Sequence, residues 1–312
     1  MANSSRFLHH DAYVPGMNKS IRERLIILLQ LGKIKISIPV ALTGFLGYYR
    51  ASGALNEDFL FTFFGILLLS MGSSTFNHIQ ERNTDRLMKR TSGRPIPAGR
   101  INVHSAVIAG SLFGITGLVL LLLTGSIPAA AIGIFTLAWY NLVYTPLKRV
   151  TPFAVFPGAV IGALPPMIGW TAAGGNLVAP EILLISFFLF IGQMPHYWLL
   201  MMKIGDEFRS AGLPVITEIF SGSRLRDLSF VWIIAAAVAV LIFPVSGIMH
   251  SQTIALLMVG GVILFMIRMF LLSFRGEIMA QWRKSFITVN LFYLFIIVIL
   301  IADKFAEPYL YK

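Results

Sequence analysis

Nine apolar runs dominate this sequence, each close to or above the length needed to cross a bilayer. A helix needs roughly 20 apolar residues to span about 30 Å of hydrocarbon. The runs lie at about residues 34–50, 59–76, 105–124, 127–145, 153–173, 180–202, 228–248, 253–274 and 286–303. They are long and uninterrupted, so they predict helices and not the ten-residue alternations of a barrel. We therefore expect an all-α polytopic membrane protein with nine transmembrane helices.

The composition supports this prediction. Of the 312 residues, 56% are hydrophobic and 12% charged, whereas a soluble domain has about a quarter of its residues charged. Mean hydropathy is +0.78. The chain has no cysteine, which excludes disulfides, thiolate metal sites and cysteine nucleophiles. The net charge of +11 falls in short loops between the apolar runs, so it indicates membrane topology and no nucleic-acid partner.

Basic loops alternate with loops that contain no basic residue. Lysine and arginine are absent from every second loop: 51–58, 125–126, 172–179 and 249–252. The positive-inside rule then predicts a cytoplasmic N-terminus and an external C-terminus, which requires an odd number of spans. His250, in the loop 249–252, is expected to be an ordinary surface residue.

The expected domains follow from these boundaries. Residues 1–33 form a cytoplasmic N-terminal segment, with an amphipathic helix over about 21–31 lying on the membrane surface. Residues 34–303 form the helix bundle, and residues 304–312 are a short external tail.

The stretch from 77 to 100 concentrates charge directly after the second apolar run. Asn77, Glu81 and Asp85 are spaced i, i+4, i+8, so they line one face of a helix that continues out of the membrane. Oxygen ligands in this number suit Mg²⁺, which is usually bound through a few carboxylates plus substrate phosphates. Bases that suit phosphate follow in the same stretch: Lys89, Arg90 and Arg94. An ordinary basic loop would explain the bases but not the oxygen stripe, so we predict a metal diphosphate site.

A second charged cluster lies at 195–214. His196, Lys203 and Glu207 share one helical stripe, and Asp206 lies beside it. We expect Lys203, Asp206 and Glu207 to be catalytic, with both acids joining the metal site. An ionisable residue inside a span is a functional candidate, although His196 could equally make a hydrogen bond between helices.

A third stretch, 140–153, aligns polar residues on one helical side: Asn141, Tyr144, Thr145 and Lys148. Tyr144 and Lys148 are predicted to bind diphosphate. The segment 158–170 follows, and its glycines allow close helix contact while Pro165 and Pro166 break or kink the fifth span.

These motifs resemble those of the UbiA superfamily of intramembrane prenyltransferases. NxxxExxxDxxMKRTxxRPxPxGR resembles the first signature of its heme O synthase branch, the protoheme farnesyltransferases. YTPLKRxTP with GAxPPxIGW, and PHYWxxxxKxxDEFxxAGxP, resemble the middle and second acidic regions of that branch. The likeness covers roughly residues 33–215. Three departures are Glu81 in place of aspartate, Ala154 in place of asparagine, and adjacent Asp206–Glu207 in place of spaced aspartates.

The resemblance implies a nine-helix bundle whose central cavity opens to lipid, with two acidic motifs facing each other at its cytoplasmic end. It implies Mg²⁺-dependent transfer of a farnesyl group from farnesyl diphosphate to a vinyl group of heme b, giving heme O, in a bacterial inner membrane. His196 would contact the heme by iron ligation or by a propionate hydrogen bond.

Other functions remain open at this point. A quinone precursor, another aromatic or a lipid could replace heme b as the acceptor. A transporter, or a heme carrier without catalysis, would be a different class of protein, but a transporter favours charges near the bilayer midplane. Prenyl chain length and oligomeric state are left open.

Overall fold

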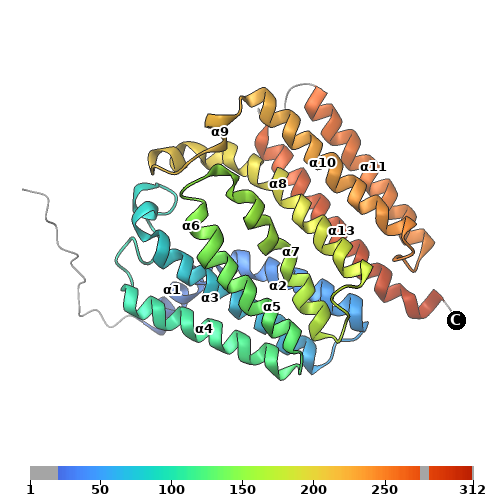
Figure 1. Ribbon diagram of the computed structural model, residues 1–312, viewed down its shortest axis with the longest axis horizontal. Coiled ribbons are helices and arrows are strands. Elements are labelled where there is room, and N and C mark those ends of the chain that lie inside the picture. Colours follow the sequence, from blue (N-terminus) through green and yellow to red (C-terminus); the bar gives the residue numbers. More distant parts are fainter. Residues whose placement is uncertain (1–19, 275–280, 311–312) are drawn as a thin grey trace, which may run out of the picture.

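The computed structural model describes residues 20–274 and 281–310, and every element of secondary structure in these residues is helical. The long helices run alongside one another in a single bundle (Figure 1). Residues 1–19 and 311–312 lie outside the described part, and with them most of the expected N-terminal segment and the end of the expected tail.

The first half of the bundle runs from α1 to α7. Its elements are α1 (Ile21–Leu31), α2 (Ile34–Ser52), α3 (Glu57–Leu87), α4 (Val103–Leu123), α5 (Ile127–Ala138), the π-helix η1 (Trp139–Tyr144), α6 (Thr145–Leu147), the 3₁₀ turn η2 (Pro152–Ala154) and α7 (Val155–Ala172). The second half comprises α8 (Pro180–Ser210), the short α9 (Ile216–Ile219), α10 (Gly222–Val245), α11 (Gln252–Phe274) and α13 (Trp282–Leu310).

The expected membrane architecture is confirmed. Within the described residues, eight helical segments are long and apolar enough to cross a membrane, and a ninth is added when α1 and α2, bent by 58°, count as one span. The amphipathic helix expected at 21–31 is α1. Side-chain caps fix several starts, because Asn56, Asn102, Ser126 and Ser221 each accept a hydrogen bond from the first turn of the following helix. Ser126 thereby separates two apolar runs that sequence alone barely divides.

Two helices, α3 and α8, are much longer than the membrane requires. Each has 31 residues, which at a rise of 1.5 Å per residue is about 46 Å. Both project charged turns at the end of the bundle where α1, α6 and α9 lie, on the left of Figure 1. We call this end the charged end.

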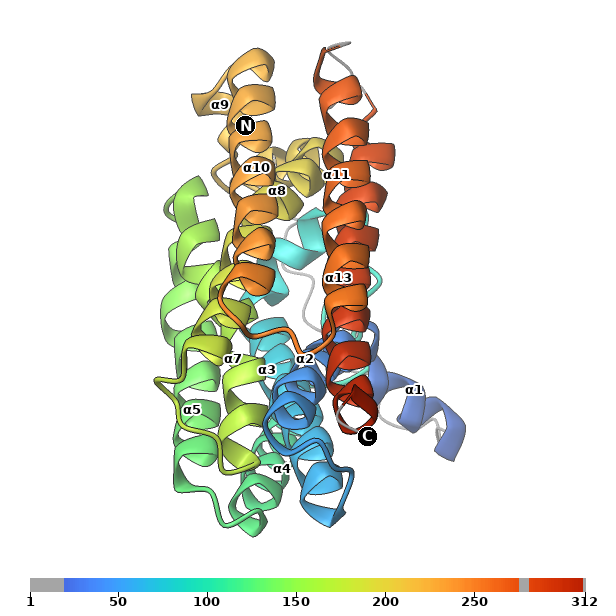
Figure 2. The same cartoon turned by 90° about the vertical axis from the view of Figure 1, so that its right-hand side faces the viewer.

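The helices of each half pack against one another, and the two halves meet where α7 contacts α8 and α2 contacts α13. In the first half α3 packs against α4 and α2 against α7; in the second α8 packs against α10 and α13, and α11 against both α10 and α13. Figure 2 shows α11 and α13 running side by side. The larger apolar core belongs to the second half and includes Phe188, Val240, Met269 and Ile296.

The crossing of α2 and α7 depends on glycine. A Cβ on Gly47 would overlap the carbonyl of Pro166, and one on Gly169 would overlap the carbonyl of Gly44. The expected close contact is therefore present. The proline pair does not break the helix, because α7 continues through both prolines from Val155 to Ala172.

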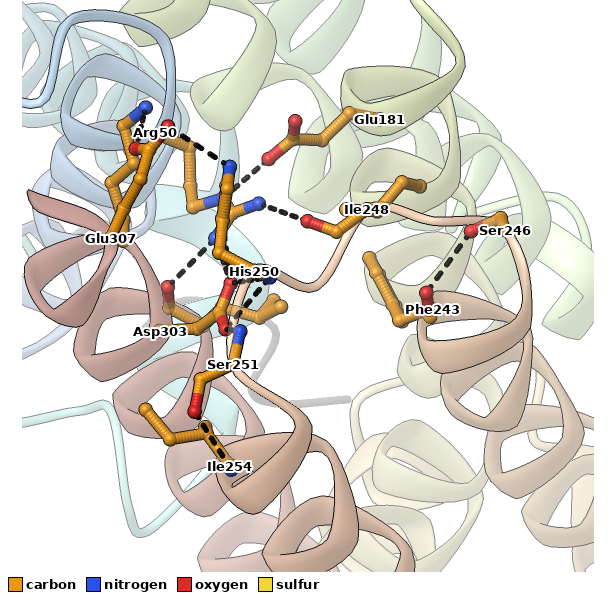
Figure 3. A network of polar contacts seen from close by, with 12 residues as sticks. Arg50, Glu181, Phe243, Ser246, Ile248, His250, Ser251, Ile254, Asp303 and Glu307 are labelled. Carbon is orange, nitrogen blue, oxygen red and sulfur yellow. Dashed lines mark hydrogen bonds and ion pairs between the residues drawn. The ribbon is translucent and has the colours of Figure 1, made fainter. Parts of the chain in front are cut away.

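A buried ion network closes the bundle at the opposite end (Figure 3). Arg50 of α2 pairs with Glu181 of α8 and donates to Asp303 of α13 at 2.9 Å. Asp303 also accepts from the backbone nitrogen of His250 (3.0 Å) and lies 3.0 Å from that ring. His250 is thus no ordinary surface residue, because its ring lies between Asp303 and Glu307.

Candidate active site

The oxygen stripe expected on α3 is buried at the charged end. The exposed fraction is 0% for Asn77, 5% for Glu81 and 0% for Asp85. Burying carboxylates in an apolar bundle is costly unless each is paired. A cation contacts each member of the stripe: Lys33 Nζ lies 2.6 Å from Asn77 Oδ1, Lys148 pairs with Glu81, and Arg94 donates to both oxygens of Asp85 at 2.9 and 2.7 Å.

The same stripe is matched, turn by turn, by the helix that runs through α5, η1 and α6. Three contacts follow one another: Asn141 with Ser73 (3.4 Å), Thr145 with Asn77 (3.2 Å), and Lys148 with Glu81. The polar side predicted for 140–153 therefore faces α3. The π-helical stretch η1 lies in this region, and such stretches are frequent at functional sites because they change which residues face a neighbour.

Lys33 was not anticipated as a site residue. It lies at the bend between α1 and α2 with φ 46°, the only positive φ at a non-glycine residue in the described part of the chain. The bend turns its amine inward to Asn77. The sequence offers one signal, a lysine after Gly32 directly before an apolar run, but a basic residue at this place is also typical of an ordinary membrane boundary.

The loop between α3 and α4 folds over the stripe. Arg94 returns from this loop to Asp85, and Arg100 fastens the loop to α1 by donating to Gln30 at 2.7 Å. Met88 packs against Ala211 and Leu213, which follow α8. The loops that carry the two charged clusters are therefore neighbours.

Glu207 is the acid of the second cluster that reaches the first. Its Oε2 accepts a hydrogen bond from the backbone nitrogen of Arg90 at 3.1 Å. Asp206 does not contact the first cluster. Its side chain is 99% exposed and lies 3.6 Å from Arg209 on its own helix. Successive helical residues point about 100° apart, so a helix that turns Glu207 toward Arg90 turns Asp206 away.

Two expected bases also lie outside the cluster. Lys203 is exposed, with its amine 5.8 Å above the ring of Trp282, and Lys89 is exposed in the loop. The aromatic ring on α13 offers Lys203 a cation–π contact. The structure thus brings together Asn77, Glu81, Asp85, Arg94 and Lys148, places Glu207 beside Arg90, and leaves Lys203, Asp206 and Lys89 pointing away.

An apolar cavity of about 360 Å³ begins where the charged cluster ends. Residues of α2, α3, α5, η1, α7 and α8 line it. Its wall is mainly apolar, as in Val40, Ile66 and Leu69, and its polar members include Gln193, Tyr144 and His196. Lys148 lies 5.7 Å from the centre of the Tyr144 ring, so Tyr144 joins the cavity to the charged cluster.

A second pocket, of about 540 Å³, lies beside the first under α1 and the loop. Its charged lining residues are all basic: Lys33, Lys35, Arg90 and Arg94. His78 also lines it, and neither nitrogen of this buried ring has a hydrogen-bond partner among the described residues. Lys33 and Ile36 line both spaces. A basic compartment and an apolar compartment therefore meet at Lys33.

The side-chain oxygens of the α3 stripe are suitable ligands for a Mg²⁺ ion that also binds oxygens of the substrate. All are oxygens, the ligands that Mg²⁺ prefers. Within the described residues no three His, Asp or Glu side chains gather closely enough to hold a metal ion by themselves, so substrate oxygens or water would have to complete the coordination sphere. Asp206 is no part of this set.

Comparison with known proteins gives a consistent result. The sequence profile of the UbiA prenyltransferase family matches residues 37–297. A protoheme IX farnesyltransferase of Oleidesulfovibrio alaskensis is 34% identical over 274 residues, covering 88% of this chain and 95% of that protein. The enzyme of the same name from Geobacter sulfurreducens is 41% identical over 191 residues, covering 60% and 69%.

Solved structures share the fold at low sequence identity. A digeranylgeranylglyceryl phosphate synthase superposes with a TM-score of 0.75 at 18% identity, covering 91% of this chain and 99% of the other. A UbiA homolog from Archaeoglobus fulgidus, bound to GPP and Mg²⁺, has a TM-score of 0.64 at 15% identity, covering 88% and 99%.

Proposed function

Because the chain belongs to the UbiA prenyltransferase family, we propose that this integral membrane prenyltransferase moves a farnesyl group from farnesyl diphosphate to a vinyl group of heme b, giving heme O. One observation carries the proposal: a basic compartment and an apolar cavity meet at Lys33. A prenyl diphosphate has the same division, a multiply charged head on an apolar chain. The names of the relatives, protoheme IX farnesyltransferase, support heme as the acceptor.

The diphosphate would lie against the α3 stripe. Arg94, Lys148 and Lys33 already contact the oxygens of that stripe. They can turn from these oxygens to phosphate oxygens, with Arg90 at the edge of the second pocket. Asn77, Glu81 and Asp85 would hold Mg²⁺, which neutralises diphosphate charge when bound. The GPP and Mg²⁺ of the Archaeoglobus fulgidus homolog support this assignment.

The residues of the cluster then favour departure of the diphosphate. As the C–O bond of farnesyl diphosphate ionises, negative charge grows on the leaving oxygen, and preformed cations near that oxygen stabilise the transition state most. Tyr144, at the junction with the cavity, is within reach of the same group. The allylic cation would form in the mainly apolar cavity, where few water molecules compete for it. The vinyl group of heme b would attack this cation to form the new C–C bond, and one water molecule would then add to the resulting carbocation and lose a proton, giving the hydroxyl group of heme O. No protein nucleophile is required.

The acceptor would approach through the membrane side of the cavity, with His196 in contact with it. The basic loops favour a cytoplasmic charged end, so the proposal puts the active site at the cytoplasmic face of the bacterial inner membrane.

A product assay tests the proposal. The protein in lipid nanodiscs is incubated with Mg²⁺, labelled farnesyl diphosphate, and either heme b or a quinone precursor. We expect heme b to be consumed and a product of farnesylated heme mass to form only with Mg²⁺. Label transferred to the quinone precursor while heme b stays intact would favour the alternative acceptor class. Heme bound without any product would favour a carrier.

A further inference from the structure

The His196 ring is held in place from α13, a helix that the charged cluster does not include. Its Nδ1 lies 3.1 Å from Oδ1 of Asn290. The same Asn290 donates through Nδ2 to the backbone oxygen of Phe286 at 2.6 Å. The Phe286 ring packs on the imidazole with 4.9 Å between ring centres. One edge and one face of His196 are therefore fixed by a single turn of α13.

These contacts determine which nitrogen of His196 carries the proton. A backbone carbonyl can only accept, so the amide nitrogen of Asn290 must face Phe286 and its oxygen must face His196. That oxygen is also only an acceptor, so Nδ1 of His196 must be the donor. In a neutral imidazole the other nitrogen, Nε2, then has a free lone pair. A doubly protonated ring would bury a charge in an apolar cavity, which is unfavourable.

The Nε2 edge is the one that remains for the cavity. His196 is among the lining residues, and Nδ1 is occupied by Asn290. Among the described residues no hydrogen bond reaches Nε2. A nitrogen with a lone pair ligates a metal or accepts a proton, but it cannot donate to a carboxylate. Iron ligation is therefore favoured over the propionate contact, because a propionate oxygen would need a hydrogen-bond donor at Nε2.

We infer that Asn290 is a positioning residue that holds His196 in the Nδ1–H tautomer, so that Nε2 ligates the iron of the porphyrin acceptor. The inference rests on the proposed function, since it takes heme b as the substrate. Metal-bound histidines commonly donate their other ring N–H to an oxygen acceptor, which fixes both tautomer and ring orientation. A protein histidine on heme iron is a common mode of binding, and here it would fix the porphyrin relative to the farnesyl site.

The test measures heme binding without turnover. Heme b is titrated into full-length protein in nanodiscs without farnesyl diphosphate, and the iron–histidine vibration of the ferrous complex is recorded with the affinity. We expect wild type to give the histidine signature and His196→Ala to lose it, with added imidazole restoring it. Asn290→Leu should bind heme about 10–100-fold more weakly.

Two further variants separate positioning from packing. Asn290→Asp keeps an acceptor oxygen and should keep the histidine signature. Tyr293→Phe removes a 2.9 Å hydrogen bond from α13 to the Gly192 oxygen of α8, and it should bind heme as wild type does. An Asn290→Leu protein that behaves like Tyr293→Phe would overturn the positioning role.

The two proposals fail in different ways. If wild type farnesylates heme but His196→Ala keeps the same iron spectrum, iron ligation by His196 is wrong and the proposed function stands. If wild type neither binds heme nor makes the product, both are wrong.

Discussion

Lys33 is the residue where the two compartments meet, and its backbone is unfavourable. A left-handed conformation at a non-glycine residue costs on the order of 1 kcal/mol or more, and φ is 46° here. The bend between α1 and α2 supplies that conformation, and it directs the amine to Asn77.

A substitution at Lys33 tests the effect of its strained backbone separately from the effect of its amine. In Lys33→Gly the backbone strain is relieved, so thermal stability should be unchanged or higher. Loss of the amine should raise KM for farnesyl diphosphate about tenfold or more, since hydrogen bonds to charged groups contribute about 1.5–3 kcal/mol. Arg24→Gln, at an exposed residue of α1 that lines neither pocket, is the control. An unaltered KM with reduced stability would show that Lys33 is structural.

The adjacent acids of α8 offer a paired comparison. Glu207 contacts the Arg90 backbone and Asp206 is turned outward. Glu207→Gln should lower kcat/KM about tenfold or more, because Glu207 is predicted to join the metal site and a neutral amide binds Mg²⁺ more weakly than a carboxylate, while Asp206→Asn should stay within about twofold. Steady-state farnesyl transfer by both variants decides. A larger loss in Asp206→Asn would mean that the two side chains exchange places when substrate binds.

The sequence predicted one acidic cluster better than the other for a physical reason. The spacing of Asn77, Glu81 and Asp85 places them on a single face of any helix, so their alignment needs no tertiary information. The direction of Asp206 depends on how α8 is rotated against α10 and α13. Local spacing does not contain that rotation, and the same holds for Lys33, whose role depends on a bend between two helices.

At the scale of elements, glycine contacts set how closely α2 and α7 approach. Both helices line the cavity, through Val40 and through Ile168. Their close contact therefore fixes two neighbouring parts of the cavity wall.

A matched pair of glycines tests this contact. Gly47→Ala would push a Cβ into the Pro166 carbonyl, whereas a Cβ on Gly260 in α11 meets nothing within 4 Å. We expect Gly47→Ala to lower the melting temperature in detergent, and Gly260→Ala to keep or raise it, because alanine favours a helix by about 1 kcal/mol over glycine. Equal melting temperatures for the two variants would contradict the close contact.

Helix boundaries were largely predictable, since caps and apolar runs are local signals. Asn56, Asn102 and Ser126 cap where runs begin. The π-helix at Trp139–Tyr144 was not predictable from sequence, because it depends on the contacts that α5 and α6 make with the α3 stripe.

At the scale of the whole molecule, the two ends of the bundle have different roles. The charged end holds cation–oxygen contacts that substrate could replace, and the opposite end holds an ion network built on a fully buried pair. Arg50 and Asp303 have side chains with 0% exposure, and they join the first and last long helices of the described chain.

Breaking this network should lower the free energy of unfolding and leave the rate of farnesyl transfer unchanged. Asp303→Asn removes one partner of a buried pair, which costs about 3–5 kcal/mol, whereas Asp227→Asn, in an exposed pair with Arg226, should cost less than about 1 kcal/mol. Unfolding in mixed micelles measures both. The farnesyl-transfer rate per folded molecule should match wild type in each, and a rate loss without destabilisation in Asp303→Asn would contradict the division.

In the proposed reaction, the oxygen stripe of α3 binds the diphosphate through Mg²⁺ at the mouth of the cavity. The most direct measurement is the Mg²⁺-dependent rate of labelled farnesyl transfer by Asp85→Ala, compared with wild type at equal amounts of folded protein in nanodiscs. We predict that Asp85→Ala inserts and folds but has no measurable turnover at any Mg²⁺ concentration. Turnover near the wild-type rate would contradict the assignment.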